Sequence, residues 1–228
     1  MSIVKSEKNS ISIDKDHILD IKTVQSIAIK ILCEALKELL TDSTLIFDND
    51  GIKLIAMDST KSVLIFLKLD SSKFESYYCK EQIKIGINFL NLLDINNDDI
   101  TIPPAEFETE LTMPSQDFQK LIRDMINIGE ECEIKSYGKS LLFNCDGDFA
   151  SQSTILNETQ DGLQFINNCE NDSLVQGIFS LKYLSLFTKC TNLCNQIQLF
   201  IKNDYPLIIQ YSIASLGIIK LCLAPKVN

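Results

Sequence analysis

The sequence predicts an α+β fold in which antiparallel sheets carry a few helices on one face. Short runs that alternate apolar and polar residues recur along the 228 residues, and turn-forming residues separate them. Three longer stretches repeat apolar residues at the spacing i, i+3, i+4 and i+7, which is typical of a helix with one buried face. Helix and strand signals follow one another in the same order twice, so the chain looks like a duplicated pair of domains.

The first half contains one clear helix signal and one clear hairpin signal. Apolar residues at the helical spacing predict a helix near residues 24–40. The Asn-Asp-Gly turn at 49–51 then separates two apolar runs, which is typical of a β-hairpin. The second half repeats this order, with a helix near 115–127 and a pair of strands on either side of Gly138. Further elements are predicted as strands over 62–69, 76–79, 84–89, 107–113, 174–180, 197–202, 206–212 and 217–223, and as a third helix near 181–190.

The stretch between the two halves shows neither a helical nor a strand period. Its Pro-Pro pair at 103–104 fixes φ and removes two backbone donors, so no regular helix or central strand can pass through it. We predict a first domain over residues 18–93, a linker over 94–106 and a second domain over 107–228. Residues 1–17 are mostly polar, and we expect a flexible N-terminal extension there.

Composition narrows the class of protein. The net charge is −10, which taken alone argues against a nucleic-acid partner. No apolar run reaches the length of about 18 residues that a membrane span needs, so we expect no membrane partner. The 8 cysteines form no Cys-x-x-Cys pair, and His17 is the only histidine. We therefore predict buried thiols in a reducing compartment, without a metal site and without a cofactor.

Familiar catalytic motifs are missing from the sequence. It has no glycine-rich phosphate loop, no Gly-x-Ser-x-Gly elbow and no His-Glu-x-x-His zinc motif. His17 lies in the polar N-terminal stretch, where nothing positions it as a general base. The acid pairs at 98–99 and 130–131 lie in predicted linker or turn segments, where solvation is the simpler explanation. We predict that the protein is not an enzyme.

Basic residues lie on the exposed sides of all three predicted helices. Solvated lysines on a helix are ordinary, so one interpretation is a plain hydrophilic surface. In a chain of charge −10, three such helices also favour a surface that faces a polyanion. On the first helix we expect Glu34 to pair with Lys37 at i+3. The basic residues are Lys30, Lys37, Lys120, Arg123, Lys182 and Lys189.

Two short motifs and three helix segments carry a family resemblance. The motifs are Ala-Met-Asp-Ser at 56–59, after the first hairpin, and Leu-Ala-Pro-Lys at 223–226, close to the end of the chain. The helix segments lie at 24–40, 113–124 and 180–189. Together with the acidic linker, they resemble the eukaryotic-type sliding clamp family of proliferating cell nuclear antigen. The similarity extends from about Ile18 to Lys226.

The resemblance implies a DNA clamp fold, in which two similar domains place antiparallel sheets outside and helices toward the centre of a ring. It implies a homotrimer that encircles duplex DNA as a sliding clamp and polymerase processivity factor in replication and repair. The six basic residues match family positions that face DNA, with contacts to the backbone and not to the bases. Implied partners are DNA polymerase, the clamp loader and other proteins with clamp-binding peptide motifs. The expected location is the nucleus, or a cytoplasmic viral factory if the source is a large DNA virus.

The same resemblance implies a partner-peptide groove on the outer face, beneath the linker. Such a groove binds a short helix by its apolar anchors and adds main-chain hydrogen bonds. Cys222 stands where the family commonly has an aromatic residue and Lys61 where a histidine is common, so both change the groove. The matching residues are Met57, Leu64, Ile100, Ile102, Pro206, Leu223, Ala224, Pro225 and Lys226.

One departure from the family pattern is large. Phe89 runs directly into Leu90, where the family has a further segment with a helix, several strands and most of the edge strand used for trimerisation. The sequence is an edited form, omits a segment or is a natural short variant. If the chain is continuous here, we expect a distorted first domain or a lost ring, because apolar surface and strand edges are exposed. The alternative function is therefore a truncated, non-encircling peptide-binding module or decoy of the clamp family.

Overall fold

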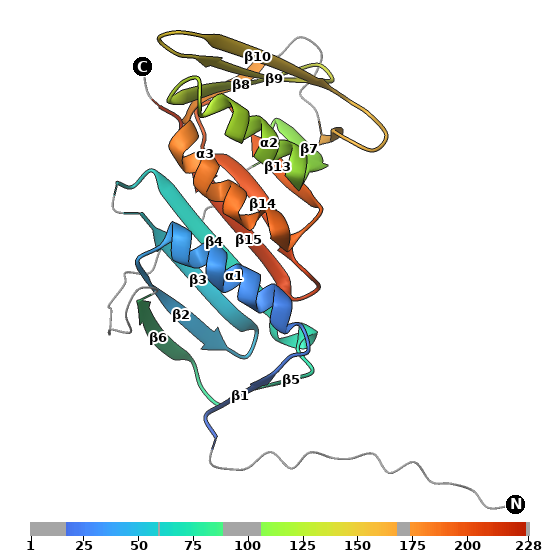
Figure 1. Cartoon of the computed structure of the whole chain (residues 1–228). Helices are drawn as coiled ribbons and strands as arrows, with labels where there is room; N and C mark the ends of the chain where they lie inside the picture. The colour runs from blue at the N-terminus through green and yellow to red at the C-terminus, as the bar shows by residue number, and fades with distance from the viewer. Residues whose placement is uncertain (1–16, 59, 89–105, 168–173, 227–228) are drawn as a thin grey trace, which may run out of the picture.

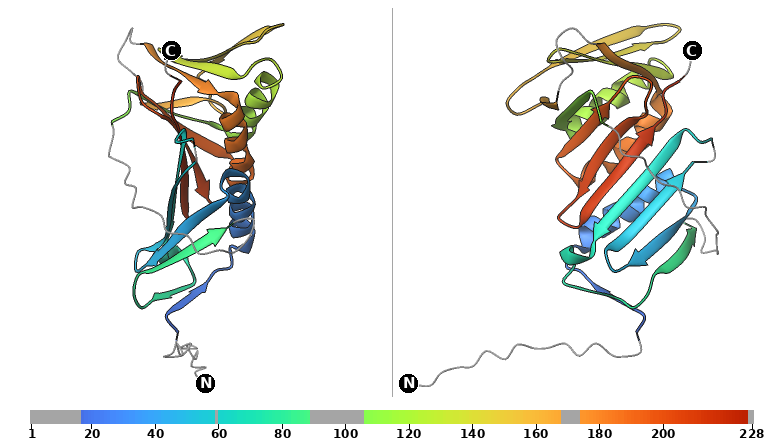
Figure 2. Two further views of the ribbon diagram at one scale, coloured as in Figure 1. Left: turned by 90° about the vertical axis from the view of Figure 1, so that its left-hand side faces the viewer. Right: turned by 180° about the vertical axis from the view of Figure 1, so that it is seen from behind.

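A computed structural model describes residues 17–58, 60–88, 106–167 and 174–226 of the chain. Three α-helices lie side by side on one face of a long antiparallel sheet, and the other face of this sheet carries no helix of the described chain (Figure 1, Figure 2). Among the described residues, no helix is both long enough and apolar enough to span a membrane. The predicted α+β class is confirmed.

In each half of the chain, an α-helix follows the first strand. In the first half they are β1 (Leu19–Lys22), α1 (Ser26–Leu39), β2 (Asp42–Asp48), β3 (Gly51–Met57), β4 (Val63–Asp70), the 3-10 helix η1 (Ser71–Lys73), β5 (Ser76–Cys79) and β6 (Ile83–Asn88). In the second half they are β7 (Thr109–Pro114), α2 (Ser115–Met125), β8 (Glu131–Tyr137), β9 (Ser140–Asp146), β10 (Ser151–Asn157), β11 (Gln164–Asn167) and β12 (Leu174–Ser180). The chain then continues through α3 (Leu181–Phe187), the 3-10 helix η2 (Thr188–Leu193), β13 (Gln196–Ile201), β14 (Leu207–Ile213) and β15 (Gly217–Leu223).

One nine-stranded sheet passes through both halves in the order β11-β7-β13-β14-β15-β4-β3-β2-β6. The joint between the halves is the antiparallel pair of β15 and β4, which runs over residues 217–223 and 63–69. In the middle of this pair Ile219 lies opposite Leu67, and both side chains are buried in one apolar core that contains residues of both halves. The halves are therefore parts of one sheet with a shared core.

Helices α1 and α2 each bury a row of apolar side chains, as the spacing of their apolar residues predicts. Both begin without a side-chain cap, although Ser115 is the first residue of α2. The hydroxyl of Ser115 donates instead to the carbonyl oxygens of Cys194 and Thr191, at 2.6 and 3.3 Å. These hydrogen bonds hold the start of α2 against the segment around η2. The buried residues are Leu32, Ala35 and Leu36 in α1, and Phe118, Leu121, Ile122 and Met125 in α2.

The two halves repeat one arrangement of strands. The order β6-β2-β3-β4 in the long sheet corresponds to β12-β8-β9-β10, which forms a separate four-stranded sheet. The pair β5-β1 corresponds in the same way to β11-β7. The limits of the two predicted domains stay a prediction, because residues 89–105 of the linker region lie outside the described residues.

The halves differ beyond the repeated strands. After β12 the chain forms α3, η2 and β13 to β15, and these strands extend the sheet next to β7. After β6 only residues 89–108 precede β7, and no strand of the described chain lies on the corresponding side of β1. The first half is left with a two-stranded sheet where the second half has the five strands β11-β7-β13-β14-β15.

Strands β10 and β11 were not predicted from the sequence. Strand β10 alternates exposed and half-buried residues and has no fully buried one, so its apolar pattern is weak. Strand β11 has only 4 residues. The third helix, predicted near 181–190, ends as an α-helix at Phe187 and continues as η2, so its last turn is tighter than predicted.

Most of the described cysteines are buried, as predicted, but Cys33 is exposed on α1 and that prediction is wrong. Burial raises the pKa of Cys132 and Cys190 to about 12, so these thiols stay protonated and behave as small apolar side chains. Cys169 lies outside the described residues. Within the described ranges, no group of His, Cys, Asp and Glu is placed to hold a metal ion.

Gly217 lets β15 lie close to β4, and replacing it tests the joint between the halves. A Cβ atom on Gly217 would lie 1.9 Å from the carbonyl oxygen of Lys68. We expect Gly217→Ala to lower the free energy of unfolding by about 1–3 kcal/mol, measured by urea denaturation, because the strands must separate. Gly138→Asn is the control, since nothing lies within 4 Å of its Cβ position and asparagine tolerates its positive φ. A Gly217→Ala variant as stable as the parent would contradict the close approach.

Candidate functional site

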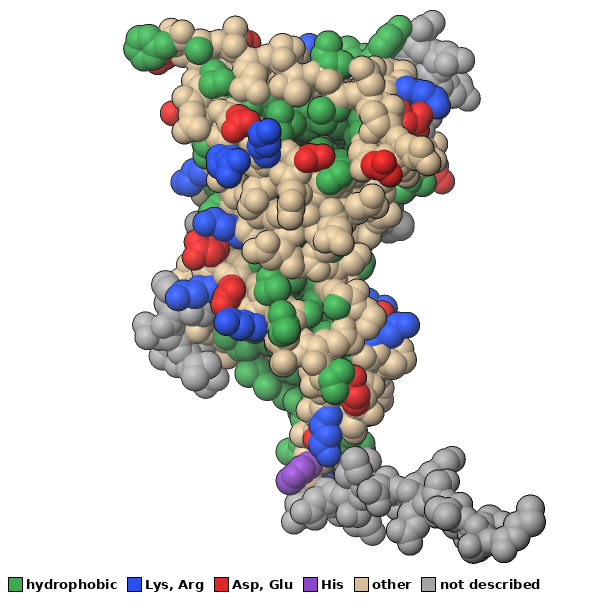
Figure 3. Space-filling model, turned by 45° about the vertical axis from the view of Figure 1, so that its right-hand side comes forward, with side chains coloured by type: hydrophobic (Ala, Val, Ile, Leu, Met, Phe, Trp, Pro, Cys, Tyr) green, Lys and Arg blue, Asp and Glu red, His purple; other side chains and the backbone are tan. Residues whose placement is uncertain are grey.

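The helix face of the nine-stranded sheet is the first of two candidate surfaces. Helices α1, α2 and α3 lie beside one another on it and bring together basic residues that are far apart in the sequence (Figure 1). Figure 3 shows Lys and Arg side chains following one another down this side of the molecule, with Asp and Glu side chains between them. All six predicted basic residues are exposed: Lys30 and Lys37 on α1, Lys120 and Arg123 on α2, Lys182 on α3 and Lys189 on η2.

The charge of the helix face differs in sign from that of the whole chain. The exposed acids on the same helices are four, Glu34, Glu38, Asp117 and Asp124. Six positive charges against four negative ones leave a balance of +2, whereas the chain carries −10. The acidic excess therefore lies elsewhere on the molecule.

Two of the six basic residues take part in weak ion pairs. Lys30 lies 3.8 Å from Glu34 and Lys189 lies 4.0 Å from Glu38, with all four side chains at least half exposed. The predicted pairing of Glu34 with Lys37 is wrong, because the carboxylate of Glu34 approaches Lys30, one helical turn earlier. Exposed pairs of this kind contribute about 0–1 kcal/mol, so an incoming anion can replace the carboxylate.

The other four basic residues carry no ion pair in the described part of the chain. Lys37, Lys120 and Arg123 have no carboxylate oxygen within 4.0 Å there. The ammonium group of Lys182 lies 5.9 Å from the ring centre of its neighbour Tyr183. These side chains are therefore available to an anionic partner, and the spacing of the three helices spreads them over a broad surface.

On the opposite face of the sheet, apolar side chains form a row across five strands. Cross-strand pairing places Met57 beside Leu64 and Leu64 beside Cys222. It continues from Cys222 to Ile208 and from Ile208 to Phe200. Met57 at one end is 41% exposed, whereas Cys222 and Ile208 in the middle are buried. We call these five residues the outer row.

The C-terminal residues of the described chain bridge the two halves at the end of this face. The N–H of Ala224 donates to the carbonyl oxygen of Ser62 at 2.9 Å. The N–H of Lys226 donates to the carbonyl oxygen of Ile178 at 2.8 Å, and its side chain forms an ion pair with Glu131. The tail is thus fixed between β4 and β12.

A groove of about 630 Å³ opens beside the tail. It lies between β12, the turn that joins β13 to β14, and Pro225. One wall is fixed by Asn203, whose side-chain oxygen accepts the N–H of Gln176 at 2.9 Å and whose amide group donates to the carbonyl of Leu174 at 3.0 Å.

The structure brings most of the predicted peptide-binding residues to this outer face. Met57 and Leu64 belong to the outer row. Leu223 has its side chain in the core, so only its backbone can line a groove. Ile100 and Ile102 lie outside the described residues. The remaining residues are Pro206, Ala224 and Pro225, which are half-buried, and Lys226, which is exposed.

An aromatic cluster beside the outer row was not predicted. The ring of Phe107 lies 5.3 Å from that of Phe200 and 5.7 Å from that of Tyr205, measured between ring centres. The ammonium group of Lys220 lies 5.5 Å from the ring centre of Phe200. These residues are distant in the sequence and come together only through strand pairing, so no local pattern reveals them.

Asp58 holds the turn between β3 and β4. Its carboxylate accepts the N–H groups of Val63 and Ser62 at 2.7 and 2.8 Å and the hydroxyl groups of Thr60 and Tyr183. Burial raises the pKa of Asp58, but the hydrogen bonds from Thr60, Val63 and Ser62 outweigh it and lower the pKa below its usual range. Because Tyr183 belongs to α3, Asp58 also links the first half to the helices of the second.

Comparison with known proteins assigns the family. The model described as "Proliferating cell nuclear antigen, N-terminal domain" matches residues 18–142, and the model of the C-terminal domain matches residues 101–226. The chain is also 32% identical to "Probable DNA polymerase sliding clamp 1" of Paramecium bursaria Chlorella virus 1, over 93% of this chain and 98% of the relative. The chain therefore belongs to the proliferating cell nuclear antigen family and has the DNA clamp fold of that family.

The viral relative is longer than this chain over the stretch that the two share. Their alignment runs over 261 residues, more than the 228 residues of the chain, so the relative carries residues without a counterpart here. In the described residues, the strand order gives the first half no counterparts of the three strands that follow β12 in the second. The predicted position of the break, after Phe89, stays a prediction.

The lowered pKa of Asp58 makes its contribution to stability depend on pH. We expect Asp58→Asn to lower the free energy of unfolding at pH 7 by about 0.5–1.5 kcal/mol, because partly buried N–H donors lose a charged acceptor and solvent screens part of the effect. A folded pKa below the unfolded value of about 3.9 means that the stabilisation is present above that pH and is lost as the pH falls through the folded pKa.

Urea denaturation of the parent and the variant at about pH 7 and about pH 3 measures this difference. The gap between the two proteins should shrink at the lower pH. Asp161→Asn, at an exposed position, is the control and should leave stability unchanged at both values. A gap that stays constant with pH would contradict the ionised acceptor.

Proposed function

We propose that this chain acts as a DNA sliding clamp and polymerase processivity factor. The observation that carries the proposal is the division of one continuous sheet into a helix face with basic side chains and an outer face with an apolar row. The helix face holds duplex DNA, and the outer face holds partner proteins. A relative named as a DNA polymerase sliding clamp supports this, since it matches nearly the whole chain. The protein binds and tethers, and it catalyses no reaction itself.

Contacts on the helix face are to phosphate groups. Exposed lysine and arginine side chains on helices that lie across a duplex reach the backbone and displace its counterions, which is independent of base sequence. The acidic residues between them keep the net charge of the helix face small, so this face attracts DNA only weakly. A loose, sequence-independent contact lets the protein move along DNA, while the acidic remainder of the molecule is repelled by it.

Encirclement requires subunits that close into a homotrimeric ring, and we place the subunit contact at the edge of β10. Within the described chain, β10 pairs with β9 alone. Its sequence SQSTILN carries no charge, although edge strands are usually protected from pairing by charged residues or proline. Beside it, Phe149 is fully exposed and Ile155 is 59% exposed. A strand of a neighbouring subunit that pairs with β10 covers both.

Partner proteins dock on the outer row and the adjoining groove. DNA polymerase, the clamp loader and other proteins with clamp-binding motifs present a short helix whose apolar anchors contact Met57, Leu64 and Ile208. The backbone beside the helix donates to carbonyl oxygens of the tail at 224–226, because the N–H groups of Ala224 and Lys226 are already bonded and Pro225 has none. Cys222 leaves a small side chain in the middle of the row, so this clamp accepts bulky anchors there.

A second candidate function is a non-encircling peptide-binding module. It is favoured by the first half, whose described residues contain no counterparts of the strands that follow β12 in the second half, while the outer row is intact. Size-exclusion chromatography with light scattering separates the two candidates. A stable trimer of the 25.7 kDa chain favours the clamp, and a monomer that binds peptide but is not retained on circular DNA favours the module.

Removing basic residues from the helix face should weaken DNA binding in a salt-dependent way. We expect Lys120→Ala/Arg123→Ala to reduce the salt slope of binding to a blunt duplex by about 0.9 for each phosphate that the variant no longer neutralises. Fluorescence anisotropy at several low salt concentrations measures the slope. Lys68→Ala/Lys220→Ala removes the same charge from the outer face and should leave the slope unchanged. Equal effects of the two double variants would contradict a DNA-binding helix face.

A charge placed in the outer row should weaken peptide binding without affecting DNA binding. Met57 is partly exposed, so Met57→Asp should fold normally. We expect an affinity loss of about 10- to 100-fold for a fluorescent peptide with a clamp-binding motif, because an apolar anchor then meets a carboxylate. Ile126→Asp, at a position of similar exposure at the end of α2, is the control. Unchanged affinity in Met57→Asp would exclude the outer row as the peptide site.

A further inference from the structure

Two cysteines face each other beneath the end of α2. Strands β8 and β9 pair in antiparallel fashion from their shared turn to Glu133, which lies opposite Asn144. Cys132 and Cys145 are the next residues on the two strands beyond this pair. Both side chains lie on the buried face of the strands, with exposed fractions of 0% and 1%. Continuing the register therefore places the two thiols opposite each other in the core.

Both sulfur atoms contact the same residue, Met125, which is buried and is the last residue of α2. The Sγ atom of Cys132 lies 3.7 Å from the Sδ atom of Met125, and the Sγ atom of Cys145 lies 3.6 Å from the carbonyl oxygen of Met125. Burial raises the pKa of both thiols, and the neighbouring Cys145 is the second cause for Cys132. The shared contact and this electrostatic influence make the two thiols close neighbours.

Residues opposite each other on antiparallel strands are at a suitable distance for a disulfide. Their Cα atoms are about 4.5 or 5.5 Å apart. A disulfide joins residues whose Cα atoms are about 4.4–6.8 Å apart. Rotation of the two side chains can therefore link Cys132 to Cys145, while β8 and β9 stay in register.

Losing the S–H group of Cys145 does not leave its acceptor unpaired. The thiol is only a weak donor to the carbonyl oxygen of Met125. This oxygen also accepts the N–H groups of Ile128 and Gly129, at 2.9 and 3.2 Å. The carbonyl keeps these stronger hydrogen bonds when the thiol becomes part of a disulfide, so the buried polar groups do not oppose the bond.

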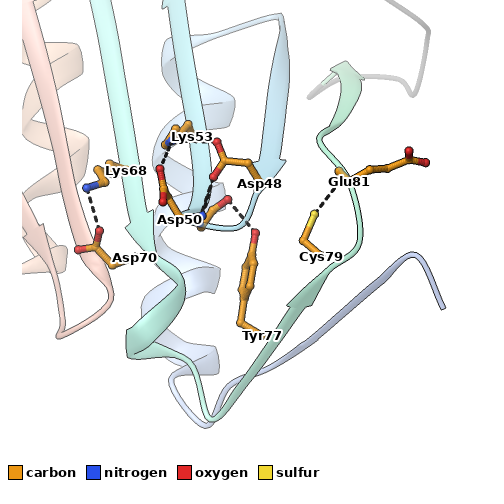
Figure 4. A network of polar contacts seen from close by, with 9 residues as sticks. Asp48, Asp50, Lys53, Lys68, Asp70, Tyr77, Cys79 and Glu81 are labelled. Atoms are coloured by element: carbon orange, nitrogen blue, oxygen red, sulfur yellow. Dashed lines mark hydrogen bonds and ion pairs between the residues drawn. The ribbon is translucent and has the colours of Figure 1, made fainter. Parts of the chain in front are cut away.

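Cys79, another buried cysteine, provides a contrast. Its thiol donates to the carbonyl oxygen of Glu81 at 3.0 Å, and Figure 4 shows the side chain pointing to this residue beside the end of β5. The residue opposite Cys79 in the register of β1 and β5 is Leu19. Burial alone therefore accounts for a single cysteine such as Cys79, whereas two cysteines at facing positions form a pair that oxidation can link.

We propose that Cys132 and Cys145 are a modification site, at which a low-molecular-weight disulfide converts the two thiols into one S–S bond across β8 and β9. The thiolate of Cys145 attacks a sulfur of the small disulfide, whose S–S bond breaks and releases one small thiol. The thiolate of Cys132 then attacks the Cys145 sulfur of the mixed disulfide and releases the second small thiol. The two cysteines lose two electrons and two protons, which the two released thiols carry away. This site is separate from the proposed DNA and peptide sites and does not depend on them.

The site reacts slowly in the folded chain. Both thiols are buried and stay protonated, whereas exchange requires an accessible thiolate. The reaction therefore proceeds when the end of β9 opens locally, and Cys145 reacts first because the turn at 147–150 follows this strand end. Once formed, the bond closes the loop between residues 132 and 145 and holds β9 to β8. Because β10 pairs with β9, this edge strand then opens less often.

The test exposes the full chain to glutathione disulfide, both in the folded state and during refolding from urea, when the thiols are accessible. Remaining thiols are alkylated, and linked peptides are identified by mass spectrometry after digestion with trypsin and a protease that cleaves at aspartate. The second cleavage separates Cys145 from Cys169, because aspartates lie between them in the sequence. We expect the bond between Cys132 and Cys145 to be the main product of refolding, to form more slowly in the folded chain and to be reversed by dithiothreitol.

The linked chain should be more stable than the reduced chain. We expect the urea midpoint of unfolding to rise by about 1 M, because the bond restricts the unfolded chain. Cys145→Ala should lose both the bond and the rise, and Cys132→Ala is a second variant with the same expected result. Cys79→Ala is the matched control, since it removes a buried thiol that faces no cysteine, and it should keep both.

The proposal is overturned if refolding in glutathione disulfide links other cysteines in preference to Cys132 and Cys145. It is also overturned if the linked chain unfolds at the same urea concentration as the reduced chain, or at a lower one. A rise of the same size in Cys145→Ala would overturn it as well, because a different modification would then cause the stabilisation.

Discussion

The pairing of β15 with β4 is the interaction on which the rest of the structure depends. It turns two half-chains, each with its own strands and helices, into one sheet with a helix face and an outer face. The basic residues of α1 and those of α2 and α3 then share one surface. The outer row exists for the same reason, because it crosses the joint between Leu64 and Cys222. A change that separates the two strands removes both surfaces together.

Strand edges decide how the chain assembles. The edge of β4 is covered by β15, whereas β10 and β1 each have one open side within the described residues. These two open edges belong to the two ends of the molecule (Figure 1). The uncharged sequence of β10 fits the proposed pairing with a strand of a neighbouring subunit.

Local patterns in the sequence were sufficient for α1 and α2, because a helix with one buried face repeats its apolar residues at a fixed spacing. They were not sufficient for β10, which has no fully buried residue, or for Cys33, whose exposure depends on what covers α1. The outer row depends on the register between distant strands, from Met57 to Phe200, and no local pattern contains it. The motif at 56–59 indicated the family. The structural role of its Asp58 could not be predicted, because the hydrogen-bond donors come from the next strand and from α3.

The most direct test of the account is retention on circular duplex DNA. The chain would be assembled on a nicked circle, washed at high salt, and then released by linearising the DNA. We predict that the protein stays on the circle at high salt and leaves once the DNA has free ends. Equal loss from circular and linear DNA would show that the helix face does not enclose the duplex, and would contradict the sliding clamp.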